Sequence, residues 1–286
     1  MNAVKSVLKQ QLPRWAGYQL KKIILFVRGI AYRGNAFYCP ICQQGYAKFF
    51  DGGFDLPVID QMQIIGAGRR KNIICPGCAS NDRDRLVYLA LQAPQLQLLP
   101  AKKILHIAPE PALVGFLQKN QQLDGNTYIM GVKYHEGFYY DNNIQLIDLT
   151  ALEFDDHMFD LLICNHVLEH IADDDRAMRE IFRVVKPEGK AILQVPWSPL
   201  LEKTYENEAI IKPKDRETHF GQFDHVRLYG KDYAAKLMKT GFIIDQLGIN
   251  DLAPKDKAIE KYALNTKEVI FVGTKPSEPH VKPAIS

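Results

Sequence analysis

The chain has 286 residues, of which 47% are apolar and 24% are charged, and these values are those of a folded protein with one or two domains. A collagen, a low-complexity disordered chain and a disulfide-dense mini-protein are therefore excluded, and no apolar stretch reaches the length of a membrane span. The net charge is +3, but the first 50 residues carry eight basic side chains and no acidic one. The N-terminal segment is thus the part of the chain that attracts anionic partners.

Residues 1–35 are expected to form one or two amphipathic helices with basic polar faces, because apolar residues such as Leu20, Ile24 and Val27 recur at helical spacing. One interpretation is a helix that packs on the body with its basic face in water. The other is an interfacial anchor, or a docking helix for an anionic partner. The segment lacks the apolar core and cleavage site of a signal peptide, so we expect a cytoplasmic protein, which the anchor interpretation would place on the inner face of the membrane.

Residues 36–100 are expected to form a zinc-binding module and a linker helix. Cys39 and Cys42 form one Cys-x-x-Cys pair, and Cys75 and Cys78 form another. Two such pairs place four thiolates around one tetrahedral ion, which is typical of a structural Zn²⁺ site in a zinc-ribbon-like module. The alternatives are two disulfides or a redox dithiol. A cytoplasmic location disfavours the disulfides, and a redox site would need only one pair.

From residue 101 to 274, strand-like and helix-like segments alternate, which predicts an α/β domain with a parallel sheet covered on both faces. The expected strands are residues 104–107, 127–132, 144–148, 159–165, 191–195, 242–247 and 268–272. The expected helices are residues 81–92, 111–120, 173–185 and 232–240. Residues 197–230 read as a mostly irregular insert, and the proline-rich tail 275–286 is expected to be disordered.

Two adjoining segments carry a family resemblance. Phe159–Ile171 contains a strand that leads into a polar loop with Leu-Glu-His, and Ile181–Ala191 contains a helix end followed by Lys-Pro-Glu-Gly. Together they resemble the class I S-adenosylmethionine-dependent methyltransferases of type 11, over about residues 102–275. The resemblance implies a Rossmann-like, seven-stranded, mostly parallel sheet that is closed by an antiparallel hairpin of the last two strands. It also implies S-adenosylmethionine as the cofactor.

The resemblance places Asp148 and Leu149 at the adenine, and Asn165 and His166 along the opposite wall of the cofactor site. The first loop departs from the family pattern, in which an acidic residue is followed by Gly-x-Gly-x-Gly and the glycines let the backbone approach the cofactor. Lys133 stands where the family has an acid after the second strand. The cofactor contacts expected from these two loops are His106, Ala108, Glu110 and Glu136. We interpret the first loop as a subgroup variant, with loss of the cofactor as the alternative.

The insert after the fifth strand is dense in polar side chains, and it leaves the sheet where a methyl acceptor is expected. An alcohol or amide acceptor profits from a general base, and histidine is suited to this role near pH 7. We therefore predict catalytic roles for His225, His219 and Asp224. The alternative is a polar loop that is held together by its own hydrogen bonds.

These features predict an S-adenosylmethionine-dependent methyltransferase that acts on a sugar, a glycan or another small-molecule acceptor. An RNA methyltransferase is one alternative, since some rRNA methyltransferases also carry N-terminal cysteine modules. The net acidic charge beyond residue 50 disfavours nucleic acid. A non-catalytic binding protein with this fold is the other alternative, because the first loop is poor in glycine. The sequence does not indicate an oligomeric state.

Overall fold

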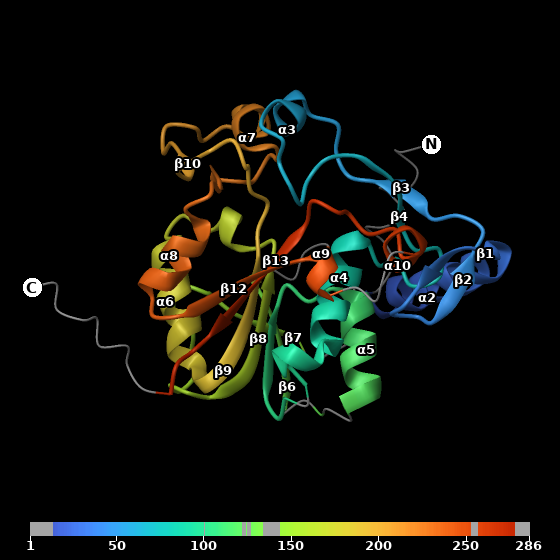
Figure 1. Cartoon of the computed structure of the whole chain (residues 1–286), viewed down its shortest axis with the longest axis horizontal. Helices are drawn as coiled ribbons and strands as arrows, with labels where there is room; N and C mark the ends of the chain where they lie inside the picture. The colour runs from blue at the N-terminus through green and yellow to red at the C-terminus, as the bar shows by residue number, and fades with distance from the viewer. Residues whose placement is uncertain are drawn as a thin grey trace, which may run out of the picture.

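The structure is a computed structural model that describes residues 14–99, 101–121, 124, 127–133, 144–252 and 257–277. The chain forms an α/β body, with a smaller N-terminal module beside it and an insert next to that module (Figure 1). The described part of the chain holds no helix that is both long and apolar enough to cross a membrane. The first 13 residues and the tail from residue 278, for which the sequence predicts helix and disorder, lie outside the described residues.

A seven-stranded sheet runs through the body. Its strands are β5 (Ile104–Ile107), β6 (Tyr128–Val132), β7 (Ile144–Leu146), β8 (Phe159–Asn165), β9 (Val185–Gln194), β12 (Ile243–Gly248) and β13 (Val269–Thr274). Their spatial order is β12-β13-β9-β8-β5-β6-β7, in which β13 is antiparallel to both neighbours and the other pairs are parallel. This order confirms the expected mostly parallel sheet and its closing antiparallel hairpin.

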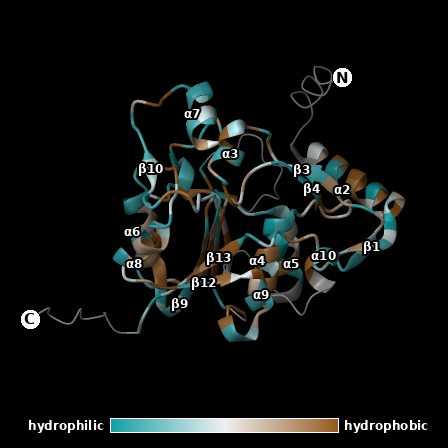
Figure 2. Ribbon diagram, turned by 45° about the horizontal axis from the view of Figure 1, so that its top comes forward, coloured by the Kyte–Doolittle hydropathy of each residue, from teal (hydrophilic) through white to brown (hydrophobic). Residues whose placement is uncertain are grey.

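Helices cover both faces of the sheet (Figure 1). One face carries α4 (Asp82–Gln92), α5 (Pro111–Gln121) and α9 (Ile249–Leu252), and the other carries α6 (Asp174–Val184) and α8 (Tyr233–Lys239). Because side chains alternate across a strand, Ile104 packs with the first group of helices and Leu105 with the second. Figure 2 shows the apolar residues gathered along the sheet between these layers. Burial on both faces explains why β8 is an almost continuous apolar run.

The fifth strand begins earlier than the sequence predicts. Lys186–Gly189 is expected to form a turn before a strand at 191–195, but β9 continues through it. The pairing of β8 with β9 shifts at this point, so a bulge absorbs the additional residues. Glu188 has a positive φ of 63°, and its N–H donates to the carbonyl of Lys275 at 2.7 Å. The prediction of a turn was therefore wrong, because a bulge accommodates proline and glycine without ending the strand.

The N-terminal module consists of one long helix and two small antiparallel sheets. Its elements are α2 (Arg14–Ala31), β1 (Arg33–Cys39), β2 (Gln44–Tyr46), β3 (Phe50–Gly52), α3 (Pro57–Gln61) and β4 (Arg70–Ile74). β1 pairs with β2, and β3 pairs with β4. A helix within the basic segment was predicted, and α2 confirms it for the described residues. The short helix α10 (Lys257–Lys261) lies near β1 in Figure 1.

The insert is more ordered than the sequence predicts. It contains β10 (Tyr205–Glu206), α7 (Pro213–Phe220) and β11 (Arg227–Leu228). Phe220 and Leu228 share an apolar cluster with Val58, Ile59 and Ile64 of the N-terminal module. In both overall views α3 and α7 lie together above the sheet (Figures 1 and 2). The insert and the module thus form one roof over the carboxyl ends of the strands, and a local sequence pattern could not reveal this long-range packing.

A buried arginine of α4 joins the module to the body. Arg85 is fully buried, and its guanidinium donates to the carbonyls of Ser80 at 3.0 Å and Ile73 at 2.9 Å within the module. It also donates to the carbonyls of Tyr262 at 2.6 Å and Ala263 at 3.1 Å, just after α10. One cation therefore satisfies four carbonyl groups from two parts of the chain.

Replacing Arg85 by alanine should lower the free energy of unfolding by about 3–5 kcal/mol, because four carbonyls lose a charged donor. The matched control is Arg69→Ala, since Arg69 forms an exposed ion pair with Asp55 at 4.0 Å. That control should change stability by less than about 0.5 kcal/mol. Urea denaturation followed by circular dichroism measures both variants. Equal stability of the two would contradict the role assigned to Arg85.

Candidate functional site

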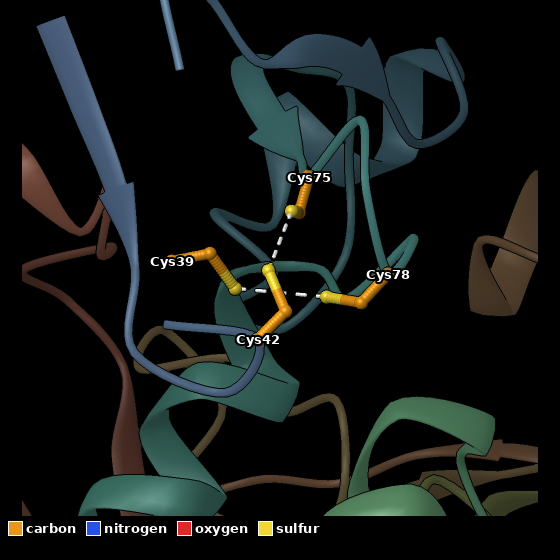
Figure 3. A group of neighbouring side chains, drawn as sticks. All are labelled: Cys39, Cys42, Cys75 and Cys78. Carbon is orange, nitrogen blue, oxygen red and sulfur yellow. Dashed lines mark hydrogen bonds between the residues drawn. The ribbon is translucent and has the colours of Figure 1, made fainter. Parts of the chain in front are cut away.

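Four cysteines converge in the N-terminal module (Figure 3). Cys39 ends β1 and Cys42 follows it, while Cys75 and Cys78 follow β4. The Sγ atoms of Cys39 and Cys78 are 3.6 Å apart, those of Cys42 and Cys75 are 3.7 Å apart, and all four thiols are free. Sulfurs bound to a tetrahedral zinc ion lie about 3.8 Å apart, since Zn–S bonds are about 2.3 Å long. A disulfide would need about 2.05 Å. The cluster therefore has the dimensions of a zinc site.

Hydroxyl groups surround the sulfur atoms. Ser80 Oγ lies 3.3 Å from Cys39 Sγ and 3.1 Å from Cys78 Sγ. Tyr46 Oη lies 3.4 Å from Cys42 Sγ. Hydroxyl groups at such positions can donate to thiolates that surround a cation. Because four cysteines would fill all positions of a tetrahedral ion, this cluster offers no open position to a substrate.

The loop after β5 takes a backbone conformation that glycine favours. Ala108, at the first glycine position of the family pattern, has a φ of 47°. Its N–H donates to the carbonyl of Gly131 on the neighbouring strand at 2.7 Å. A left-handed conformation costs an L-residue about 1–2 kcal/mol, so the surrounding structure must enforce it. The loop thus follows a glycine-like path although the glycine is absent.

A hydrogen-bonded chain of side chains replaces the usual acid of this loop. His106 is fully buried, with Nδ1 2.7 Å from the hydroxyl of Tyr128 and Nε2 2.7 Å from Glu110 Oε2. The other oxygen of Glu110 accepts from Asn165 Nδ2 at 3.1 Å. His106 therefore reaches the edge of the sheet through Glu110, which is the carboxylate that the loop presents.

Asn165 ends β8 and carries an unsatisfied acceptor. The residue is 5% exposed, and its Oδ1 is buried without a hydrogen-bond partner among the described residues. Leaving a buried acceptor unpaired costs about 1–3 kcal/mol. The carboxyl edge of β5 and β8 thus presents a carboxylate and a free amide oxygen, which together suit a ligand with hydrogen-bond donors.

Two other expected cofactor contacts, Asp148 and Leu149, follow β7, which is the last strand at one end of the sheet. Asp148 is exposed, and its carboxylate accepts from the N–H and hydroxyl of Thr150 at 2.9 and 2.7 Å. These hydrogen bonds lower the pKa of Asp148, so the group is anionic near neutral pH. Leu149 beside it is buried. Glu136, the fourth expected contact from the first two loops, lies outside the described residues.

His166 begins the loop after β8 and connects it to the N-terminal module. Its φ is 53°, and its Nδ1 lies 3.0 Å from Nη1 of Arg83, which also donates to the carbonyl of Gly66 at 2.8 Å. Because Arg83 can only donate, Nδ1 accepts and His166 is the neutral Nε2–H tautomer. Burial lowers the pKa of His166 well below its ordinary value, which agrees with this neutral form. Arg83 thereby ties the roof to the loop.

A cavity of about 270 Å³ lies beneath the roof and is here called the roofed cavity. Three segments contribute its polar lining: the module with Arg70 and Arg83, the loop after β8, and the insert. The loop and the insert supply His166, Glu169, His170, Gln222 and His225. The cavity is therefore bounded by parts of the chain that are far apart in sequence.

The structure separates the three residues for which the sequence predicts catalytic roles. His225 is 5% exposed and lines the roofed cavity. His219 is exposed on α7, with its Nδ1 3.1 Å from the hydroxyl of Tyr205, and is not among the residues that line that cavity. Asp224 lies 3.2 Å from Nδ1 of His170. Of the three, His225 is thus the residue that reaches the roofed cavity.

Sequence reasoning missed the two partners of His225. Nε2 of His225 and Nε2 of His170 each lie 3.9 Å from Oε1 of Glu169, and we call these three residues the polar cluster. Glu169 is 1% exposed. The short 3-10 turn at Leu168–His170 aims Glu169 inward. Leu-Glu-His was visible in the sequence, but only the fold brings it to the insert.

Burial controls the charges of the polar cluster. It raises the pKa of Glu169 to about 8 and lowers the pKa of His225 to about 4. Burial also lowers the pKa of His170, against the opposing effect of Asp224. Near pH 7 both imidazoles are therefore neutral, and lone pairs on nitrogen are available in the cavity.

Part of the chain is similar to known methyltransferases. Residues 92–193 match the family described as methyltransferase domain. The chain is 32% identical over 72 residues to a ubiquinone/menaquinone biosynthesis C-methyltransferase of Hahella chejuensis (strain KCTC 2396), a match that covers 23% of this chain and 29% of that protein. The protein of the same name from Pasteurella multocida (strain Pm70) is 38% identical over 52 residues, or 18% and 19% of the two chains. The chain thus spans less than a third of the length of these curated relatives.

Solved structures with similarity include an S-adenosylmethionine-dependent methyltransferase from Archaeoglobus fulgidus. It has a TM-score of 0.44 at 12% identity, over 69% of this chain and 96% of that one. The 1,6-didemethyltoxoflavin-N1-methyltransferase of Burkholderia thailandensis has a TM-score of 0.44 at 14% identity, over 66% and 77% of the two chains. The family match runs through β5, β6, β7, β8 and most of β9, whose carboxyl ends form the edge described above. Residues 92–193 are thus similar to the methyltransferase domain family, and a four-cysteine cluster lies on the N-terminal side of the matched region.

Proposed function

We propose that the chain transfers a methyl group from S-adenosylmethionine to a small polar acceptor in the roofed cavity. The position of His166 carries this proposal, because it directly follows Asn165 at the cofactor edge and also lines the cavity. The cofactor edge and the roofed cavity are thus next to each other, because consecutive residues belong to them. Methyl transfer requires such adjacency, since the reacting atoms must approach to about 3–3.5 Å.

The residues at the sheet edge fit the cofactor. Its ammonium and ribose hydroxyls are donors, and Glu110 and Asn165 supply a carboxylate and an unpaired amide oxygen. The glycine-like backbone at Ala108 supports close approach of a ligand. By family resemblance, Asp148 and Leu149 would meet the adenine. When bound, the cofactor supplies an electrophilic methyl group.

The lining of the roofed cavity favours a small polar acceptor such as a sugar residue of a glycan. Arginine, histidine and amide side chains line it, and these groups suit hydroxyl-bearing ligands. The polar cluster would activate the acceptor. A neutral His225 can accept a proton there, in line with the general base expected from the sequence.

We further propose that the four-cysteine cluster binds one structural Zn²⁺. Its sulfur spacing and its hydroxyl surroundings support this assignment. The ion would hold β1 and β4 together and thereby support the roof over the cavity. Its role is in folding and not in chemistry, because no coordination position stays open.

Calorimetric titration with S-adenosylhomocysteine tests the cofactor site. The wild-type chain should bind in the micromolar range, which corresponds to about −8 kcal/mol. Glu110→Gln should weaken binding at least tenfold, or about 1.4 kcal/mol, since it removes the carboxylate charge. Glu153→Gln, an exposed glutamate on the body, is the control and should bind as the wild type does. No binding by the folded wild type would exclude the proposed activity.

Metal analysis of the purified chain tests the zinc proposal. One equivalent of zinc should remain after dialysis against metal-free buffer, and Cys75→Ser should lose it together with much of the thermal stability. Cys164→Ala is the matched control, because Cys164 is buried in the body away from the four-cysteine cluster. Full zinc content in the Cys75 variant would refute the assignment.

We also propose that α2 contacts the surface of an anionic membrane. Six of its large apolar side chains are between 48% and 69% exposed, and the helix has no acidic residue in its sequence. They are Leu20, Ile23, Ile24, Phe26, Val27 and Ile30. An apolar face beside exposed lysines is suited to the interface of a bilayer with anionic lipids.

Cosedimentation with vesicles tests this contact. The wild type should bind vesicles with anionic lipid more than neutral ones, and Phe26→Glu should reduce that binding at least fivefold, since it adds a negative charge to the apolar face. Ile211→Glu serves as the control, because Ile211 is equally exposed but lies in the insert. If both variants bind as the wild type does, α2 is not the contact.

A further inference from the structure

The polar cluster has the arrangement of a metal-ligand set. Glu169 Oε1, His170 and His225 each offer one ligand atom, and these atoms lie within 4.8 Å of one another. Both distances from Oε1 to the histidine Nε2 atoms are 3.9 Å, which is too long for a hydrogen bond. The three groups thus converge on one point without bonding to each other.

The outer nitrogen of each histidine faces an oxygen. His225 Nδ1 lies 3.2 Å from the carbonyl of Phe220, and His170 Nδ1 lies 3.2 Å from Asp224 Oδ2. A carbonyl can only accept, so Nδ1 of His225 carries the proton and Nε2 presents a lone pair. The carboxylate of Asp224 orients His170 in the same way. Oxygen partners of this kind fix the tautomer of metal-binding histidines in proteins.

Glu169 supplies a second, independent observation. Its Oε2 is buried and has no hydrogen-bond partner among the described residues, although the side chain is 1% exposed. Its ion-pair partners in the described part of the chain are histidines alone. A buried carboxylate without a cation is strongly unfavourable, so Glu169 holds a proton unless a cation takes its place. The unpartnered Oε2 thus belongs to a carboxyl group at which a metal ion would replace that proton.

We propose that Glu169, His170 and His225 bind a divalent first-row transition-metal ion at the wall of the roofed cavity. Two imidazoles and one carboxylate on one side of an ion leave positions open toward the cavity. Ligand atoms of a tetrahedral ion with bonds of about 2.1 Å lie about 3.4 Å apart, so the two distances of 3.9 Å from Glu169 to the histidines need to shorten by about half an ångström.

This ion would also have a role in the proposed methyl transfer, and the inference about that role rests on the proposed function. An open coordination position would take the oxygen or nitrogen atom of the acceptor and orient it toward the cofactor edge. His225 would then act as a ligand that positions the acceptor. The binding of the ion itself does not depend on methyl transfer.

Titration of the zinc-loaded full chain with Co²⁺ tests the site. The wild type should take up one equivalent with the visible absorption of nitrogen and oxygen ligands, and without the thiolate charge-transfer band that exchange at the cysteines would give. Glu169→Gln and His225→Gln should each weaken this binding at least tenfold. His219→Gln is the matched control in the same insert and should bind Co²⁺ as the wild type does, because His219 lies outside the polar cluster.

Circular dichroism and zinc content establish that each variant is folded, and His170→Gln provides a third variant should one of the others fail to fold. Absence of stoichiometric Co²⁺ binding by the wild type, or equal binding by all folded variants, would overturn the proposal. Titration with S-adenosylhomocysteine separates it from the proposed function. Loss of cofactor binding with Co²⁺ binding intact would refute the methyltransferase activity alone, and the reverse result would refute the metal site alone.

Discussion

The attachment of the N-terminal module to α4 is the constraint on which the rest of the structure depends. α4 packs against the sheet through Leu86 and Leu89, while Arg83 and Arg85 point toward the module. One helix therefore belongs to both parts. Arg85 satisfies carbonyls from the module and from the segment after α10, and Arg83 connects the module to His166. These contacts help to hold the module over the carboxyl edge of the sheet.

The loop after β5 keeps the backbone path of the family pattern although the usual acid and glycine are absent. Ala108 takes the left-handed conformation that a glycine would adopt without strain, and its hydrogen bond to β6 holds it there. His106 occupies the position of the usual acid. It is buried and hydrogen-bonds to Glu110, whose carboxylate lies nearer the surface. A hydrogen-bonded group of His106, Glu110 and Asn165 thus stands at this edge, where the family pattern has a single acid.

The body of the fold could be predicted because its signals are local. β5 and β8 have the expected bounds, since a strand buried on both faces is a short continuous apolar run. Asn81 and Asp173 cap α4 and α6, since their side chains accept from backbone N–H groups at the first turn. The spacing of the four cysteines was enough to predict that they form one cluster.

The candidate site was only partly predictable, because it is made by contacts between distant segments. His225 meets Glu169 across 56 positions, and no local period encodes such a meeting. His219 lies in the same insert as His225, yet it is exposed on α7 and contacts the hydroxyl of Tyr205. The start of β9 was misjudged because proline and glycine predict turns more strongly than they predict bulges.

We infer that the cofactor edge and the roofed cavity meet at Asn165 and His166. A crystal structure of the zinc-loaded chain with S-adenosylhomocysteine tests it most directly. We expect the ligand above Ala108 and Glu110, with its sulfur atom facing the cavity beside His166. A ligand that binds elsewhere, or whose sulfur faces away from the roofed cavity, would contradict the account.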